Sequence, residues 1–203
     1  AWDDKTPAAN EESWDIKGGG AETGPVSQQT GDDSLIYTNS AMIDGVTLML
    51  NYKPSESSAL ESTTGVGIAY TGMEGLNVGV AKEDNNTAAA GVENTVMYAT
   101  YAMDAFTIGI QKNDTDSESA CGDTDFEAWG VSYAVSEDVS ISYGSSTVSF
   151  EDTSKSDQEA QAIGVSWTNG SMSVTASRHD IDNVTGTATD DRDVTEVNLT
   201  FAF

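Results

Sequence analysis

Residues 194–203, VTEVNLTFAF, end the chain with a strict alternation of apolar and polar side chains. Val197, Leu199, Phe201 and Phe203 fall on one face of an extended segment, and small or polar residues fall on the other. Because successive side chains of a β-strand point to opposite faces, this period of two predicts a strand with one apolar face.

The same period of two recurs along the chain. We predict about eleven such strands between Asp33 and the end, and no stretch has the spacing of a confident helix. The clearest segments are GVTLMLNY (45–52), GLNVGVAK (75–82), AFTIGIQK (105–112), AWGVSYA (128–134), VSISYG (139–144), AIGVSW (162–167) and SMSVTAS (171–177).

The two faces of these strands predict their surroundings. One face carries Val, Ile, Leu, Tyr and Trp, whereas the other is largely Gly, Ala, Ser, Thr and Asn, with few charges in mid-strand. Small polar groups suit the wall of a water-filled lumen, and apolar groups suit lipid. Open sheet edges would leave backbone groups unpaired in hydrocarbon. The fold class predicted is therefore all-β, a transmembrane antiparallel up-and-down β-barrel.

Composition limits the other classes. The chain has 203 residues and a net charge of −26, which predicts one domain and excludes a nucleic-acid partner, because few cations could replace the counterions of its phosphates. No apolar run is long enough for a transmembrane helix, and the polar start has no leader pattern, as expected for a mature or partial sequence. The single cysteine, Cys121, lies in a loop and forms no internal disulfide.

The connections between strands alternate between long and short through ten successive positions, as in outer-membrane barrels with long extracellular loops and short periplasmic turns. Aromatic residues beside the short turns or at the C-terminus predict one interfacial belt. These are Tyr70, Tyr101, Phe106, Tyr133, Trp167 and Phe203.

The terminal strand, YTGMEGLNVGVAKEDNN, TYAMDAFTIGIQKND and SLIYTNSAMIDGVTLMLNY together resemble the C-terminal part of a Gram-negative general porin of the alphaproteobacterial type, over residues 33–203. The resemblance implies an outer-membrane channel for small hydrophilic solutes, a homotrimer, and no catalysis. It also implies that Phe203, with Phe201 and Leu199 on the same face, belongs to the signal read by the barrel-assembly machinery.

Such porins have sixteen strands, so eleven would be the sixth to the sixteenth. Residues 1–32 would then be the loop that folds into the pore, with residues 33–203 forming the strands. The alternative is a complete twelve-stranded barrel in which SWDIK (13–17) is a further strand. The candidate constriction acids are Asp3, Asp4, Glu11, Glu12, Asp15 and Glu22, with Lys5 and Lys17 among them.

The candidate lumen wall comprises Asn51, Asn77, Gln111, Arg192, Glu196 and Asn198. The acidic constriction segment suggests a cation preference. Surplus acids in the long loops either solvate these loops or bind Ca²⁺ or Mg²⁺ that bridges to lipopolysaccharide; otherwise no cofactor is expected. The alternative function is a hydrolase, through His179 beside Asp180, or an adhesin, although no local catalytic motif accompanies that histidine.

Overall fold

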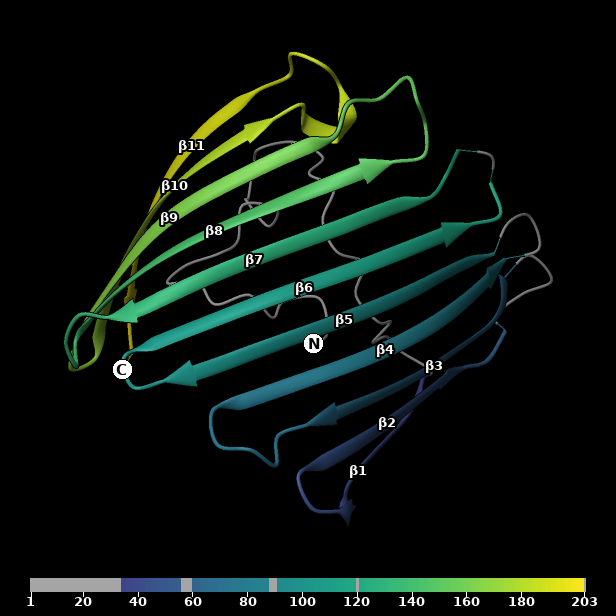
Figure 1. Cartoon of the computed structure of the whole chain (residues 1–203), viewed down its shortest axis with the longest axis horizontal. Coiled ribbons are helices and arrows are strands. Elements are labelled where there is room, and N and C mark those ends of the chain that lie inside the picture. Colours follow the sequence, from purple (N-terminus) through teal and green to yellow (C-terminus); the bar gives the residue numbers. More distant parts are fainter. Residues whose placement is uncertain (1–33, 56–59, 88–90, 120, 203) are drawn as a thin grey trace.

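A computed structural model describes residues 34–55, 60–87, 91–119 and 121–202. These residues form one antiparallel sheet of eleven strands, and each strand pairs with its neighbours in sequence (Figure 1). The strands are β1 (Leu35–Ile43), β2 (Val46–Lys53), β3 (Leu60–Tyr70), β4 (Leu76–Thr87), β5 (Val92–Met103), β6 (Phe106–Ser117), β7 (Thr124–Ala134), β8 (Val139–Phe150), β9 (Gln158–Asn169), β10 (Met172–Asp182) and β11 (Arg192–Phe201), with one 3₁₀ turn, η1 (Val184–Gly186).

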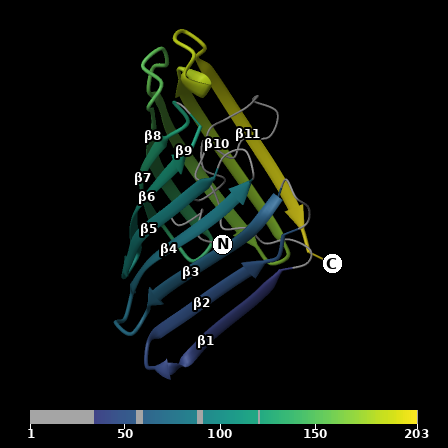
Figure 2. The ribbon, with the colours of Figure 1, turned by 90° about the vertical axis from the view of Figure 1, so that its right-hand side faces the viewer.

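The sheet is strongly curved, and β1 and β11 form its two edges (Figure 2). The prediction of an all-β, antiparallel, up-and-down sheet is confirmed, including the number of strands. Within the described ranges the outer edges of β1 and β11 have no strand partner, so the sheet does not close on itself there. None of the described segments is a helix of the length and apolarity needed to span a membrane.

The strand register separates two faces of opposite character. Ladder partners share a face, as Ile141 and Val165 do on β8 and β9. Val165 keeps 41% of its surface exposed and Ile163 59%, whereas Gly164 between them is buried. Exposed apolar side chains therefore alternate with buried small or polar ones. We call the first face outward; on β4 to β11 it carries three apolar residues per strand nearest the short turns, such as Phe106, Ile108 and Ile110.

Aromatic side chains lie at both margins of this apolar band. Near the short turns the rings of Phe106 and Tyr133, which are ladder partners, have centroids 4.5 Å apart. Farther along the strands, the rings of Trp129 and Tyr143 have centroids 5.5 Å apart. The sequence predicted the first group alone; Phe203, its last member, lies outside the described residues.

Hydrogen bonds between backbones join neighbouring short turns. The Gly45 carbonyl accepts from the Thr71 amide at 2.7 Å, and the Gly75 carbonyl accepts from the Ala102 amide at 2.8 Å. Gly75 has a φ of 76°, and a Cβ there would lie 2.2 Å from the Ala102 carbonyl oxygen, so this close approach requires glycine. The turn rim thus continues the pairing of the sheet beyond the ladders.

The strands extend farther than the apolar alternation predicted. Segments expected to be about seven to ten residues long are mostly 11 or 12 residues long. The connection between β4 and β5 shrinks to 88–91 and is no longer than the turn 71–75, so the predicted alternation of lengths fails there. Ladder hydrogen bonds do not require apolar side chains, so the pairing continues through Lys82, Glu83 and Asp84, beyond the apolar band.

Replacement of Val165 by Arg should lower the free energy of unfolding by about 2–4 kcal/mol, because this outward side chain lies within the apolar band. Glu159→Arg is the matched control on the same strand and face, near the long-loop end, where we expect about 0–1 kcal/mol. Urea unfolding of the protein in lipid vesicles measures both changes. Equal losses at the two positions would contradict the assignment of the band to lipid.

Candidate lumen wall

The face opposite the apolar band is the candidate functional surface, because it buries polar side chains in regular rows. Gln111 and Asn113 on β6 are each 3% exposed, and Glu83 on β4 is also 3% exposed. The buried polar set on this face comprises Asn51, Thr63, Glu83, Asn94, Gln111, Asn113, Ser142, Ser146, Gln158, Ser177 and His179. Buried polar groups need hydrogen-bond partners, and several of these residues supply them to one another.

Short side-chain hydrogen bonds connect neighbouring strands across this face. The Tyr98 hydroxyl donates to Asn77 Oδ1 at 3.1 Å, linking β5 to β4. Asn51 Nδ2 donates to Glu83 Oε2 at 3.3 Å, linking β2 to β4. Gln111 Nε2 donates to Asn113 Oδ1 at 3.1 Å along β6. These bonds hold amide and carboxylate groups in fixed positions, so the surface is polar and ordered.

The structure brings the residues of the predicted lumen wall to this one face. Asn51 and Gln111 are buried there, and Asn77 is half-buried. Arg192, Glu196 and Asn198 on β11 are ladder partners of Ile181, Ser177 and Thr175 on β10, and so they lie on the same face as these three residues. Arg192 contacts Asp190, with Nη2 3.4 Å from Oδ2.

This face carries few charges although the chain has a net charge of −26. Among its described side chains the basic residues are Lys53 and Arg192 and the acidic residues are Glu83 and Glu196, so the two signs balance. Most of the described acids lie instead in loops or toward the long-loop ends of the outward face. In one such loop the Ser154 hydroxyl donates to Asp152 at 2.7 Å, and this hydrogen bond lowers the pKa of that carboxyl.

Apolar clusters interrupt the polar face, which the sequence analysis did not predict. Phe126, Ala128 and Val148 pack together with Phe150 near the long-loop ends of β7 and β8. Ala81, Val96 and Tyr98 form a second cluster, and Ala160, Ile181 and Val184 form a third. The sequence could have placed Phe126 and Val148 on this face, because they lie two residues from Ala128 and Ser146 on the same strands and side chains two residues apart share a face. The face is thus a mixed wall and not a uniformly small, polar one.

Two connections at the long-loop end pack against each other. The Ser156 amide donates to the Gly186 carbonyl at 3.0 Å, and Asn183 Nδ2 donates to the Asp157 carbonyl at 3.0 Å. Lys155 Nζ lies 4.4 Å from the centre of the Phe150 ring. Val184 of η1 is 1% exposed and packs with the third apolar cluster. The connections 151–157 and 183–191 therefore form one ordered cap at the long-loop end of the wall, which we call the upper wall.

The only histidine lies in this upper wall. His179 has no exposed surface, and its Nε2 lies 2.6 Å from the Ser177 hydroxyl oxygen, which is also buried. A serine and a histidine are thus adjacent, and both are buried in this structure. Arg178 and Asp180 point to the opposite face, where Arg178 Nη2 is 3.2 Å from Asp193 Oδ1. The histidine and its aspartate neighbour, which the hydrolase alternative would combine, are therefore separated.

Several candidate residues lie outside the described ranges. The constriction acids Asp3, Asp4, Glu11, Glu12, Asp15 and Glu22, and the terminal Phe203, are among them. Leu199 and Phe201 of the predicted assembly signal lie on the outward face with about half of their surface exposed. No group of three or more His, Cys, Asp or Glu side chains within the described part could hold a metal ion.

Replacement of Gly186 by Ala should loosen the cap formed by the connections 151–157 and 183–191. Gly186 has a φ of 79°, and a Cβ there would lie 2.8 Å from Lys155 Cβ. We expect trypsin to cleave after Lys155 about tenfold faster, since left-handed backbone alone costs an L-residue roughly 1–2 kcal/mol. Gly170→Ala is the control, because its φ is 58° but no atom lies within 4 Å of the added Cβ. Unchanged cleavage in Gly186→Ala would contradict the packing.

Comparison with solved structures supports the fold. The anion-selective porin from Comamonas acidovorans superposes with a TM-score of 0.70 at 13% sequence identity, over 84% of this chain and 58% of that chain. A loop L8 deletion mutant of OmpT, an outer membrane protein of Vibrio cholerae, superposes with a TM-score of 0.65 at 17% identity, over 83% of this chain and 62% of that chain. In vitro folded OmpT superposes with a TM-score of 0.63 at 17% identity, over 95% of this chain and 66% of that chain. The chain therefore spans about three fifths of the length of the first two structures.

No curated protein matches this sequence. Residues 1–147 match the family described as Gram-negative porin, which covers more than half of the chain. The match includes the first seven strands of the sheet and part of β8. The outward apolar band, the inward polar wall and the match agree in placing the protein in the outer membrane. The chain belongs to the Gram-negative porin family.

Proposed function

We propose that the protein is a diffusion channel through which small hydrophilic solutes and ions cross the outer membrane. One observation carries the proposal: over the eight consecutive strands β4 to β11, exposed apolar side chains alternate with mostly small or polar ones. In a membrane barrel such a wall has lipid on one side and a polar lumen on the other. The selectivity of such a channel would arise from pore width and charge.

We further propose that these strands are the later part of a larger, alphaproteobacterial-type barrel. The support is the sequence resemblance together with the unpaired outer edges of β1 and β11 within the described residues, because hydrocarbon does not tolerate an open edge. By the same resemblance the protein would be a trimer and would be inserted by the barrel-assembly machinery through its C-terminal strand. The twelve-stranded hydrolase or adhesin has no favouring observation, and its histidine is buried.

Native mass spectrometry of the protein extracted from outer membranes should give a protomer heavier than 21.3 kDa and three protomers per complex. The physical reason for the first result is that additional strands are needed to pair the two sheet edges. Bilayer recordings of the same extract should then give conductance steps in groups of three. A conducting protomer of 21.3 kDa would contradict the larger barrel, and a conducting monomer would contradict the trimer.

We propose that any cation preference comes from residues 1–32 and not from the described wall. The wall balances Lys53 and Arg192 against Glu83 and Glu196, so it contributes little net field. The segment 1–32 carries the six candidate constriction acids, and a ring of carboxylates at a narrow point favours cations.

Neutralising Asp3, Asp4, Glu11, Glu12, Asp15 and Glu22 to their amides should move the zero-current potential under a KCl gradient toward zero. The matched control neutralises acids of the long connections, namely Glu118, Asp123, Glu151, Asp152, Asp157 and Asp191, and should leave the potential nearly unchanged in high salt because exposed loop charges are screened. A shift only in the control variant would show that the loops, not residues 1–32, set the selectivity.

A further inference from the structure

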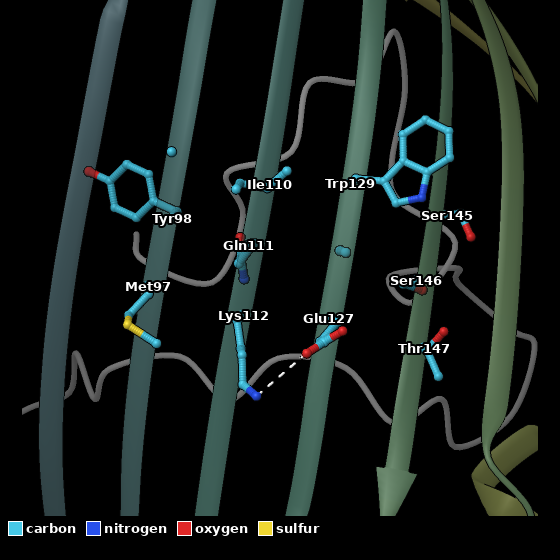
Figure 3. Close-up of a pocket in the computed structure, with 12 residues that line it drawn as sticks. Met97, Tyr98, Ile110, Gln111, Lys112, Glu127, Trp129, Ser145, Ser146 and Thr147 are labelled. Carbon is cyan, nitrogen blue, oxygen red and sulfur yellow. Dashed lines mark ion pairs between the residues drawn. The ribbon is translucent and has the colours of Figure 1, made fainter.

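The histidine of the upper wall differs from the charged residues of the outward face. Lys112 and Glu127 lie side by side on that face, with Nζ 3.5 Å from Oε1 and with 42% and 69% of their side chains exposed (Figure 3). Water solvates such exposed groups, so their ionisation has little effect on the fold. His179 has no exposed surface, and it is the only histidine of the chain. A proton on this ring would therefore lie inside the packed wall.

His179 lies next to the residues that hold the ordered cap on the wall. Its ladder partners are Ala162 on β9 and Val194 on β11. Val194 packs against the third apolar cluster, to which Val184 of the cap belongs. Ile181, two residues from His179 on the same face, is 1% exposed in that cluster. The ring and the cap thus share their packing neighbours.

The cap is also held by hydrogen bonds that can break locally. The Thr185 amide donates to Gln158 Oε1 at 2.7 Å, at the start of β9. Within the cap, the Val184 amide donates to the Asp190 carbonyl at 2.8 Å. None of these bonds belongs to a strand ladder, so the cap can open while the strands stay paired.

The charged groups that face His179 from the neighbouring strands are Arg192 and Glu196. Both lie on β11, and each is two residues from Val194. Arg192 Nη2 is 3.4 Å from Asp190 Oδ2, which reduces the field of this arginine at the ring. Glu196 is thus the described strand residue that would favour a charged ring. On β9 the described neighbours are uncharged: Ala160, Ala162 and Gly164.

The cap brings further charges to this end of the wall, and most of them are acidic. They are Glu151, Asp152, Lys155, Asp157, Asp190 and Asp191. Ordinary carboxyl groups take up protons near about pH 4, whereas an exposed imidazole does so near about pH 6.5. The two kinds of group can therefore be separated by the pH range in which they act.

Protonation changes both the hydrogen bonding and the charge of the buried ring. Its Nε2 lies 2.6 Å from the Ser177 hydroxyl oxygen. A neutral imidazole nitrogen can accept the hydroxyl proton, whereas an imidazolium nitrogen only donates. A buried cation also loses its hydration. We propose that His179 is an acid-sensitive latch, whose protonation from the outer medium opens the cap formed by the connections 151–157 and 183–191.

The latch acts in one direction. In the closed cap the ring is neutral, and in the open cap it reaches water and binds a proton below about pH 6.5. The open state then holds more protons, so acidification shifts the equilibrium toward it. The shift approaches about tenfold for each pH unit below about 6. This device belongs to the long-loop end of the fold and does not depend on the channel proposed above.

Hydrogen exchange of the whole protein, extracted from outer membranes into detergent, tests the latch between about pH 5 and 7.5. The readout is the protection of the Ser156 and Val184 amides, corrected for the intrinsic exchange rate at each pH. We expect this protection to fall about tenfold per pH unit below about 6, while ladder amides of β5 and β6 keep theirs. Constant protection would overturn the proposal. Protection that rises on acidification would also overturn it, because Glu196 would then hold the ring as a cation in the closed cap.

His179→Gln keeps a neutral hydrogen-bonding group beside Ser177 and should remove the acid sensitivity above about pH 5. Glu127→Gln is the control, since it removes an exposed titratable group of the outward face, and it should respond as the unaltered protein does. The same response in His179→Gln would overturn the latch.

If His179→Gln fails to assemble, judged by its mobility on unheated gels, nuclear magnetic resonance of the unaltered protein replaces it. The single histidine, in a preparation without a histidine tag, gives one imidazole signal. We expect the ring to become protonated only over the pH range in which the cap loses protection. A ring that titrates while the cap stays protected would overturn the proposal.

Discussion

The whole structure depends on one constraint: in hydrocarbon every backbone amide and carbonyl must find its partner within the protein. The eleven consecutive strands meet this demand along the ten edges they share, where each pairs with its neighbours in sequence. The turn rim extends the pairing, since the carbonyls of Gly45 and Gly75 accept from amides of the next strand ends. Because the backbone groups are used in hydrogen bonds between strands, the side chains alone determine the character of the two faces.

Those side chains made much of the fold predictable. Strict alternation in segments such as AIGVSW places Ile163 and Val165 outward and Gly164 on the buried face, and this alone identifies strand, face and surroundings. The strand ends were not predictable in this way. Beyond Lys82, Lys112 and Glu159 both faces become polar, and pairing continues through backbone bonds that carry no signal in the sequence.

The candidate wall was predictable in position but not in chemistry. The alternation of side chains assigned Asn51 and Gln111 to one face correctly, since this assignment needs only the correct identification of the strand. The apolar cluster of Phe126 and Val148, and the contact of Val184 with Ile181, depend on how strands and connections distant in sequence come together. A period of two says nothing about such contacts, which is why the ordered cap over the upper wall was missed.

The outward face also sets the vertical position of the protein. Three apolar levels near the turns are followed on β4, β6 and β10 by Lys82, Lys112 and Arg178, and each of these cations has a carboxylate partner on the following strand. A shift of the barrel by one level toward the periplasm would place these ion pairs in hydrocarbon and expose Tyr101 and Phe106 to water, and the opposite shift would expose Ile110 and Trp129 to water at the other margin. The change from apolar levels to ion pairs along the outward face therefore resists displacement of the protein along the membrane normal, without any contact to another protein.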